Sequence, residues 1–195
     1  MNQRRSFNKR LLAATMFPSV TLSARADAVG YAAVYDCKAE TDLIIAHHHH
    51  DWSAATRAAR WKMISTDKDP FSPQNSYSFL RVTDRRTKVQ KFQVPVPALA
   101  YLWISADSRF VVGVSDIKLW NPVQLVVFNS EGVLLLAKPV DSSSFPGVSE
   151  SVTNSVNWYR TPVPGISIEG AERSYTLRIE GNTGERRVFR FNGPA

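Results

Sequence analysis

Four consecutive histidines, His47 to His50, are the residues of this chain with the most evident chemistry. Imidazole nitrogens bind zinc, copper or nickel, and the following Asp51 could add a carboxylate oxygen. If the segment is a strand, His47 and His49 share one face while His48 and His50 share the other. The chain has no other histidine and one cysteine, so a closed metal site would need distant carboxylates. Two interpretations stay open: a divalent transition metal site at these five residues, or a solvated polar loop.

Aromatic residues in apparent loops form a second candidate site. Flat rings stack well on sugar faces, and ligand contacts are common in loops. The residues concerned are Trp120, Trp158 and Tyr159. The alternative for such residues is core or edge packing, which we expect for Trp103 within its apolar segment. The sequence thus predicts either a glycan-binding platform or additional core at these positions.

Motifs for nucleophilic catalysis are absent from the sequence. It contains neither a Gly-x-Ser-x-Gly motif nor a glycine-rich phosphate loop. Cys37 has no activating neighbour apart from Lys38, so we expect a half-buried structural thiol. Carboxylate pairs stay open, because they need no proximity in sequence. We therefore expect a non-catalytic protein without a cofactor, with the metal-dependent enzyme as the alternative.

The first 28 residues have the layout of a cleavable bacterial export signal. A basic start is followed by a mildly apolar run, Leu11 to Ala24, and by two overlapping small-x-small cleavage sites that end at Ala26 and Ala28. We expect a mature chain from residue 29 onward that is periplasmic or secreted. The apolar run has 14 residues and is interrupted by Pro18, whereas a spanning helix needs about 20 apolar residues. The mature form is therefore not expected to span a membrane.

The segment Gln3 to Lys9 resembles the twin-arginine export signal. The matching residues are Arg4, Arg5, Phe7 and Lys9. It departs from the family pattern at Gln3 and at Asn8, so the general secretory route is the alternative. The resemblance implies that folding precedes transport.

Charge and cysteine content narrow the class of protein further. The formal net charge is +7, but residues 1–28 hold five basic residues and one acidic residue, which leaves +3 for the rest. So small a positive balance argues against nucleic acid as a partner. The single cysteine excludes an internal disulfide, so the hydrophobic core must provide the stability.

The body of the chain contains a repeated hairpin within units at about residues 77–94, 99–138 and 174–192. At offsets of 45 and 97 residues, Leu80 aligns with Leu125 and with Leu177. Each copy reads as a strand, a short polar turn rich in Asp, Asn or Gly, and a returning strand. The middle hairpin is apolar on both faces, which requires cover above and below. The third alternates apolar and polar residues, so it should have one wet face. We expect the outer hairpins to flank the middle one.

The unit from Leu99 to Lys138 resembles one blade of a β-propeller. The segment Ile104 to Gly113 is similar to the Ser-Pro-Asp-Gly-Arg turn of such blades, with Ala106 and Ser108 in place of Pro and Gly. Three units are too few for a closed propeller of about four to eight blades. We therefore expect an all-β domain over residues 29–195, packed as a sandwich of antiparallel sheets or as a partial propeller that self-association could complete. One short helix is expected near residues 51–61, capped by Asp51.

These observations favour an exported, non-catalytic binding or adaptor protein of the bacterial cell envelope. Its partner would be an envelope protein or a polysaccharide. The alternatives are a metal-binding protein or metal-dependent enzyme centred on His47–Asp51, and a glycan-binding module.

Overall fold

The computed structural model describes residues 34–51, 53, 69–118, 121–151, 155–171 and 173–193. Within these ranges the chain is all-β, consists of antiparallel sheets of hairpins and contains no helix, which confirms the expected fold class. The first sheet takes four strands in chain order: β1 (Val34–Glu40), β2 (Ile44–Asp51), β3 (Ser78–Asp84) and β4 (Gln90–Pro95).

The second and third sheets repeat this meander. The second consists of β5 (Tyr101–Ile104), β6 (Phe110–Val114), β7 (Leu125–Asn129) and β8 (Leu134–Lys138). The third consists of β11 (Ile166–Ala171), β12 (Ser174–Glu180) and β13 (Arg186–Asn192). Between these two sheets in the sequence, β9 (Ser149–Glu150) and β10 (Val156–Asn157) pair as a short ribbon.

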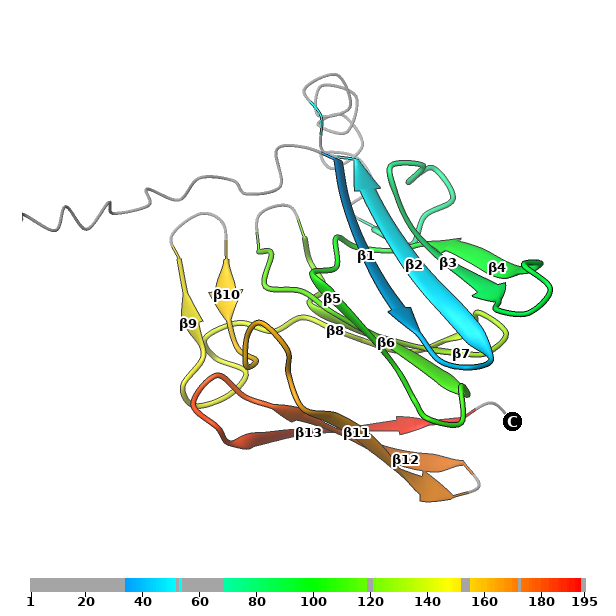
Figure 1. Cartoon of the computed structure of the whole chain (residues 1–195). Coiled ribbons are helices and arrows are strands. Elements are labelled where there is room, and N and C mark those ends of the chain that lie inside the picture. Colours follow the sequence, from blue (N-terminus) through cyan, green and yellow to red (C-terminus); the bar gives the residue numbers. More distant parts are fainter. Residues whose placement is uncertain are drawn as a thin grey trace, which may run out of the picture.

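The second sheet lies between the other two (Figure 1). One of its faces packs with the first sheet, for example Val126 against a cluster that includes Leu80. The opposite face, with Val127, packs against the third sheet, including Leu177. Successive side chains of a strand point to opposite faces, so every residue of β6 and β7 is buried. Each fully buried aliphatic side chain contributes about 1.5–3 kcal/mol, and this sheet contributes such side chains to both core clusters.

The expectation of a covered middle hairpin is confirmed for β7 and is wrong for β8. That strand is at the sheet's edge, where Leu134 is 37% exposed. The other strand that is covered on both faces is β6, which lies between β5 and β7 in the sheet. A strand at the edge of a sheet lacks one neighbour and is therefore less shielded than an inner strand.

The repeated hairpins are β3–β4, β7–β8 and β12–β13, and each is the last hairpin of its sheet. Their turns share a left-handed residue, with φ of 61° at Lys88, 86° at Gly132 and 88° at Gly184. In two of them the residue at the end of the first strand accepts backbone N–H groups of the turn. Asp84 Oδ1 accepts from Thr87 at 2.7 Å, and Asn129 Oδ1 accepts from Val133 at 2.8 Å.

The turn between β5 and β6 has the conformation that the blade-like segment requires. Ser108 has a φ of 58°, at the position where the propeller turn carries glycine. The Asp107 carboxylate stabilises this turn by accepting from Ser105 Oγ at 2.6 Å and from the Arg109 N–H at 3.1 Å. The three sheets do not close into a ring in the part of the chain that the structure describes.

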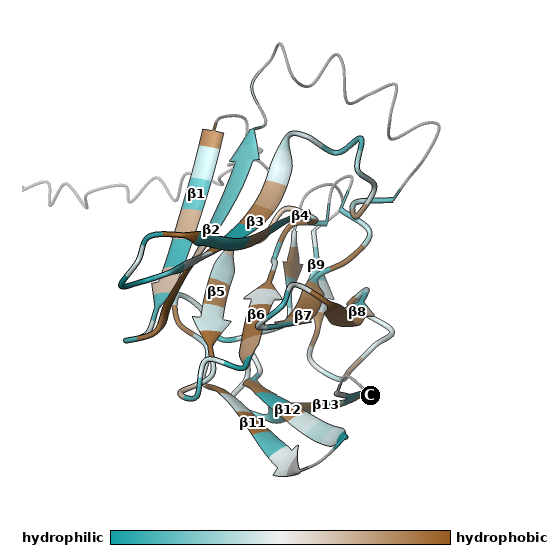
Figure 2. Cartoon of the chain, turned by 90° about the vertical axis from the view of Figure 1, so that its right-hand side faces the viewer, coloured by the Kyte–Doolittle hydropathy of each residue, from teal (hydrophilic) through white to brown (hydrophobic). Residues whose placement is uncertain are grey.

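Polar residues cover the two outer faces of the stack. Figure 2 shows hydrophilic residues along β1, β2 and β12. On β12, Tyr175, Leu177 and Ile179 are buried in alternation with residues that are more exposed, which confirms the predicted wet face. Among the described residues there is no helix of the length and apolarity that crossing a membrane requires.

The predicted helix near residues 51–61 falls almost entirely outside the described residues. Asp51 itself is the last residue of β2, and its Oδ1 accepts the Ser53 N–H at 2.8 Å. The helix therefore stays a prediction, with Asp51 at a strand end.

Candidate functional site

The histidine cluster belongs to strand β2, which pairs with β1 on one side and β3 on the other. The alternative of a solvated polar loop is therefore wrong. As the period of a strand predicts, the four side chains divide between the two faces. His47 and His49 lie on the outer face, and His48 and His50 are buried at 0% and 2% exposure.

The outer pair shares one carboxylate of the neighbouring strand. His47 Nε2 lies 2.5 Å and His49 Nδ1 lies 3.1 Å from Asp36 Oδ1. Partial burial opposes ionisation of Asp36, but the hydrogen bonds from His49 and His47 lower its pKa overall. The ring of Phe79 stacks on His49 with the centroids 5.1 Å apart.

The inner pair is part of the contact between the first and second sheets. His48 Nε2 accepts the Leu99 N–H at 3.0 Å, so Nδ1 carries the proton and donates to the Phe79 carbonyl at 3.1 Å. Burial lowers the pKa of His48 to about 4, and the ring is therefore neutral at physiological pH. Its neighbour His50 stacks on it at 6.1 Å. These two side chains are buried in the core and face away from solvent.

The five residues of the predicted metal site do not converge. Two point inward, two point outward, and Asp51 ends the strand. Across the described ranges, no group of three or more His, Cys, Asp or Glu side chains is arranged to hold a metal ion.

Of the three aromatic candidates, Trp120 lies outside the described residues. Trp158 is fully buried, with its indole N–H donating to the Ser115 carbonyl at 2.7 Å, and Tyr159 is 3% exposed. Their expected position on an exposed loop platform is therefore wrong. Both nevertheless line a cavity of about 250 Å³.

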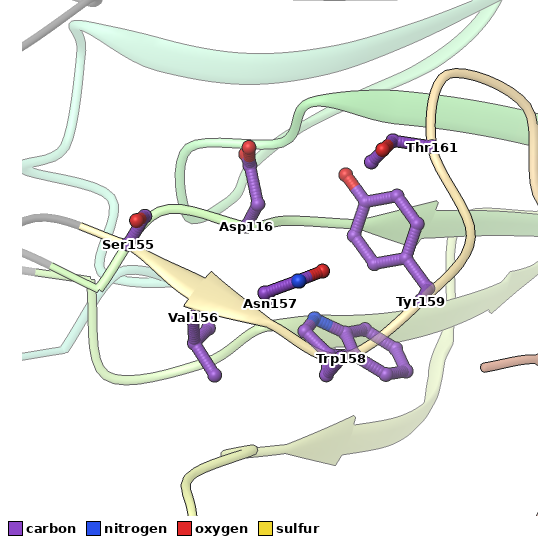
Figure 3. A pocket seen from close by; sticks show the side chains of 7 residues that line it. All are labelled: Asp116, Ser155, Val156, Asn157, Trp158, Tyr159 and Thr161. Atoms are coloured by element: carbon purple, nitrogen blue, oxygen red, sulfur yellow. The ribbon is translucent and has the colours of Figure 1, made fainter. Parts of the chain in front are cut away.

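This cavity lies where the loop after β6 meets the segment that contains β10. Its lining residues are Asp116, Ser155, Val156, Asn157, Trp158, Tyr159 and Thr161 (Figure 3). The Val156 N–H donates to the Asp116 carbonyl at 2.8 Å, and Ile117 forms a β-bridge with Ser155. These backbone contacts bring residues about forty positions apart in sequence to one place.

The third sheet fixes the other end of the lining segment. The buried Arg187 donates from Nε to the Trp158 carbonyl at 2.6 Å. Tyr159 pairs with Gly181, next to the turn between β12 and β13. The aromatic wall of the cavity is therefore held rigidly on both sides.

Polar side chains of this cavity have no partners among the described residues. Apart from the hydrogen bond between the Asp116 carboxyl and its own backbone N–H, no hydrogen bond or ion pair joins the side chain of Asp116, Asn157, Tyr159 or Thr161 to a described residue, and the Ser155 hydroxyl likewise has none. In Figure 3 the side-chain oxygens of Asp116, Tyr159 and Thr161 lie on the same side of the group. The cavity thus presents a carboxyl, an amide and three hydroxyl groups that no other described residue engages.

Burial raises the pKa of Asp116, and the hydrogen bond from its own backbone N–H offsets only part of this effect. Two of the groups that the charge of Asp116 acts on are also acids. Burial raises the pKa of Tyr159 and of Tyr35, and in both the negative charge of Asp116 adds to the rise. Burial likewise raises the pKa of Cys37 to about 12, which confirms the half-buried thiol and keeps it protonated at neutral pH.

Asp116 was missed by the sequence analysis. It follows a buried strand as an isolated carboxylate, and no motif surrounds it. A polar residue directly after a strand that is apolar on both faces is a weak signal of this kind of site.

No family model matches the chain, and no curated protein or solved structure is significantly similar to it.

Proposed function

We propose that this chain is an exported, non-catalytic binding protein of the bacterial cell envelope, and that a small polar ligand occupies the cavity beside Asp116. The observation that carries the proposal is the set of unpaired polar side chains in a cavity walled by two buried aromatic residues. Tyr159 is buried and Asp116 and Ser155 are half-buried, whereas Asn157 and Thr161 are exposed at the mouth of the cavity. Ligand sites commonly combine an apolar wall with a few free polar groups of this kind.

A binding role is favoured over catalysis by the groups that the cavity offers. None of its described lining residues is a histidine, cysteine or lysine. The protonated thiol of Cys37 is a poor nucleophile. Asp116 is a single carboxyl, whereas acid–base chemistry commonly pairs two groups of different pKa.

Filling the cavity with a larger side chain tests the ligand site. Asn157 is exposed and lies in the middle of the side chains of Figure 3, so Asn157→Trp should fill the cavity without disturbing the core. We expect at least one compound from a panel of cell-wall sugars, amino acids and diamines to raise the melting temperature of the wild type and not that of the variant. Equal responses of both proteins, or none from either, would refute the proposal.

Export is supported by the basic start, the apolar run and the cleavage-site pattern of residues 1–28. Replacing Arg4 and Arg5 together by lysine should leave the protein in the cytoplasmic fraction if the twin-arginine route is used. Alanine at Asn2 and Gln3 is the matched control and should not alter export. A wild-type protein that stays in the cytoplasm at full length would contradict the envelope assignment.

A second candidate function is binding of a transition metal on the outer face of the first sheet. The observation in its favour is that His47 and His49 lie on one face and both reach Asp36 Oδ1; the two rings would be the ligands, because no described group of three is arranged to hold a metal ion. Calorimetric titration with zinc should show binding that His47→Ala combined with His49→Ala removes. Retention of binding in that double variant would exclude this pair as the metal ligands.

A further inference from the structure

We propose that the ligand of the cavity beside Asp116 is a small organic cation with a primary ammonium group. This inference rests on the proposed binding function and names the class of ligand. It follows from the charge of the cavity, from the character of its neighbours and from the hydrogen-bond acceptors that line it.

The charge of Asp116 is not compensated within the described part of the protein. Several other carboxylates lie beside a cation: Asp107 pairs with Arg109, Glu150 with Lys118 and Glu180 with Arg160. No described lysine, arginine or histidine makes an ion pair with Asp116. Removing an ionised carboxylate from water is costly unless an opposite charge accompanies it. A bound cation would supply that charge.

The surroundings of the cavity reinforce this preference. Tyr35 and Tyr159, the two groups whose pKa the charge of Asp116 raises, are acids, which can add negative charge but never a positive one. The basic residues next to the lining in sequence, Lys118 and Arg160, pair with Glu150 and Glu180 instead of Asp116. The described lining residues include no basic side chain. An anionic ligand would therefore meet only repulsion from Asp116, while a cation is attracted.

The lining residues also match the geometry of an ammonium group. Such a group has three N–H donors and no acceptor. The oxygens of Asp116, Tyr159 and Thr161 lie on one side of the lining group (Figure 3) and can accept, and so can the amide oxygen of Asn157. The aromatic rings of Trp158 and Tyr159 favour a nearby cation as well. A neutral polyol could use the same oxygens but would leave the carboxylate uncompensated.

Three four-carbon probes separate charge from shape. Putrescine, 1,4-butanediol and succinate have similar lengths and carry positive, neutral and negative ends. We expect calorimetric titration at neutral pH to detect binding of putrescine to the purified protein, and binding of the other two to be at least tenfold weaker. Asp116→Asn keeps the shape and removes the charge, and it should weaken putrescine binding at least tenfold. Asp42→Asn is the matched control, because Asp42 is fully exposed and the net charge changes equally.

The outcomes separate the ligand class from the binding function. Putrescine binding that Asp116→Asn and Asn157→Trp abolish and Asp42→Asn preserves supports both. Binding of 1,4-butanediol or a cell-wall sugar that Asn157→Trp alone abolishes overturns the cationic ligand and retains the binding site. Putrescine binding that is weakened equally by Asp42→Asn overturns the assignment to Asp116. Absence of binding by every probe and every compound of the panel overturns both proposals.

Discussion

Two polar clusters lie side by side after strand β6, and they differ in how their groups are bonded. In the first, Asn121 Nδ2 donates to the carbonyl of Ala98 at 3.0 Å, to Ser115 Oγ at 3.1 Å and to the carbonyl of Ile117 at 3.2 Å. Gln124 Nε2 donates to the Asn121 carbonyl at 2.6 Å, and its Oε1 accepts the Val140 N–H at 2.8 Å. In the second cluster, the side chains of Asp116, Asn157, Tyr159 and Thr161 make no hydrogen bond to another described residue.

We interpret the hydrogen-bonded cluster as structural and the cavity groups as ligand-binding, although both lie in one stretch of chain. Ser115 and Asp116 are neighbours, yet the Ser115 hydroxyl accepts the Ile117 N–H at 3.0 Å while the Asp116 carboxyl faces the cavity. In the first cluster, the side chains of Asn121 and Gln124 bond to backbone groups at the point where the chain leaves strand β6. Folding does not require the cavity groups to be paired, which leaves them available to a ligand. The two clusters should therefore respond in opposite ways to substitution.

The largest effect is expected in the bonded cluster. Asn121→Ala removes three hydrogen bonds and leaves the Ala98 carbonyl without this donor, while the Ile117 carbonyl still accepts from Gln124 Nε2 at 3.1 Å. We expect a loss of about 3–4 kcal/mol in the free energy of unfolding, since each lost hydrogen bond costs about 0.5–1.5 kcal/mol and an unsatisfied buried group costs more. Urea unfolding measures this value. A loss below 1 kcal/mol would mean that the cluster is not structural.

The buried His48 should make stability depend on pH. Its pKa is about 4 in the folded protein, against 6.5 when solvated. Since the folded-state pKa is lowered, the contribution is complete above pH 6.5 and is lost as the pH falls toward 4. The loss is up to about 3 kcal/mol, at 1.36 kcal/mol per pKa unit. Urea unfolding at several pH values should give a flatter profile in His48→Gln than in the wild type, and equal profiles would contradict this role.

The carboxyl of the cavity should behave in the opposite way. Because burial raises the pKa of Asp116, its ionisation opposes folding, and stability decreases as the pH rises through that pKa. Asp116→Asn should therefore be as stable as the wild type at neutral pH or more stable, by no more than about 1 kcal/mol. The melting temperatures of the two proteins at several pH values provide the test. A markedly less stable variant would show that Asp116 has a structural partner.

The smallest effect is expected for the amide of the cavity. Asn157 is exposed and its side chain makes no hydrogen bond to a described residue. Asn157→Ala should change the free energy of unfolding by less than about 0.5 kcal/mol, as is usual for such positions. Urea unfolding beside Asn121→Ala compares the two amides directly. Similar losses for both would remove the distinction between the clusters.

Much of the fold could be predicted from the sequence because the strand period is short and local. The alternation of Tyr175, Leu177 and Ile179 with polar residues indicated one wet face, and the division of the four histidines followed from the same period. The order of layers followed from the apolar middle hairpin. The exposure of β8 depends on its place at the sheet's edge, which periodicity does not encode.

The candidate site could be predicted only in part. The sequence indicates Trp158 and Tyr159 as candidate residues because they are aromatic. Their burial, however, depends on contacts with residues of other segments, namely Ser115, Arg187 and Gly181. Asp116 stands alone in the sequence and becomes notable only when residues 155–161 pack beside it. Long-range pairing creates the cavity, so local patterns could not reveal it.

The most direct measurement is the pKa of Asp116, obtained by NMR from the chemical shift of its carboxyl carbon with and without putrescine. Without the diamine we expect a pKa above that of an ordinary aspartate, and with saturating diamine a clear decrease, because a bound cation stabilises the carboxylate. A pKa that starts at the ordinary value and does not respond to putrescine would contradict both the buried, uncompensated charge and the cationic ligand.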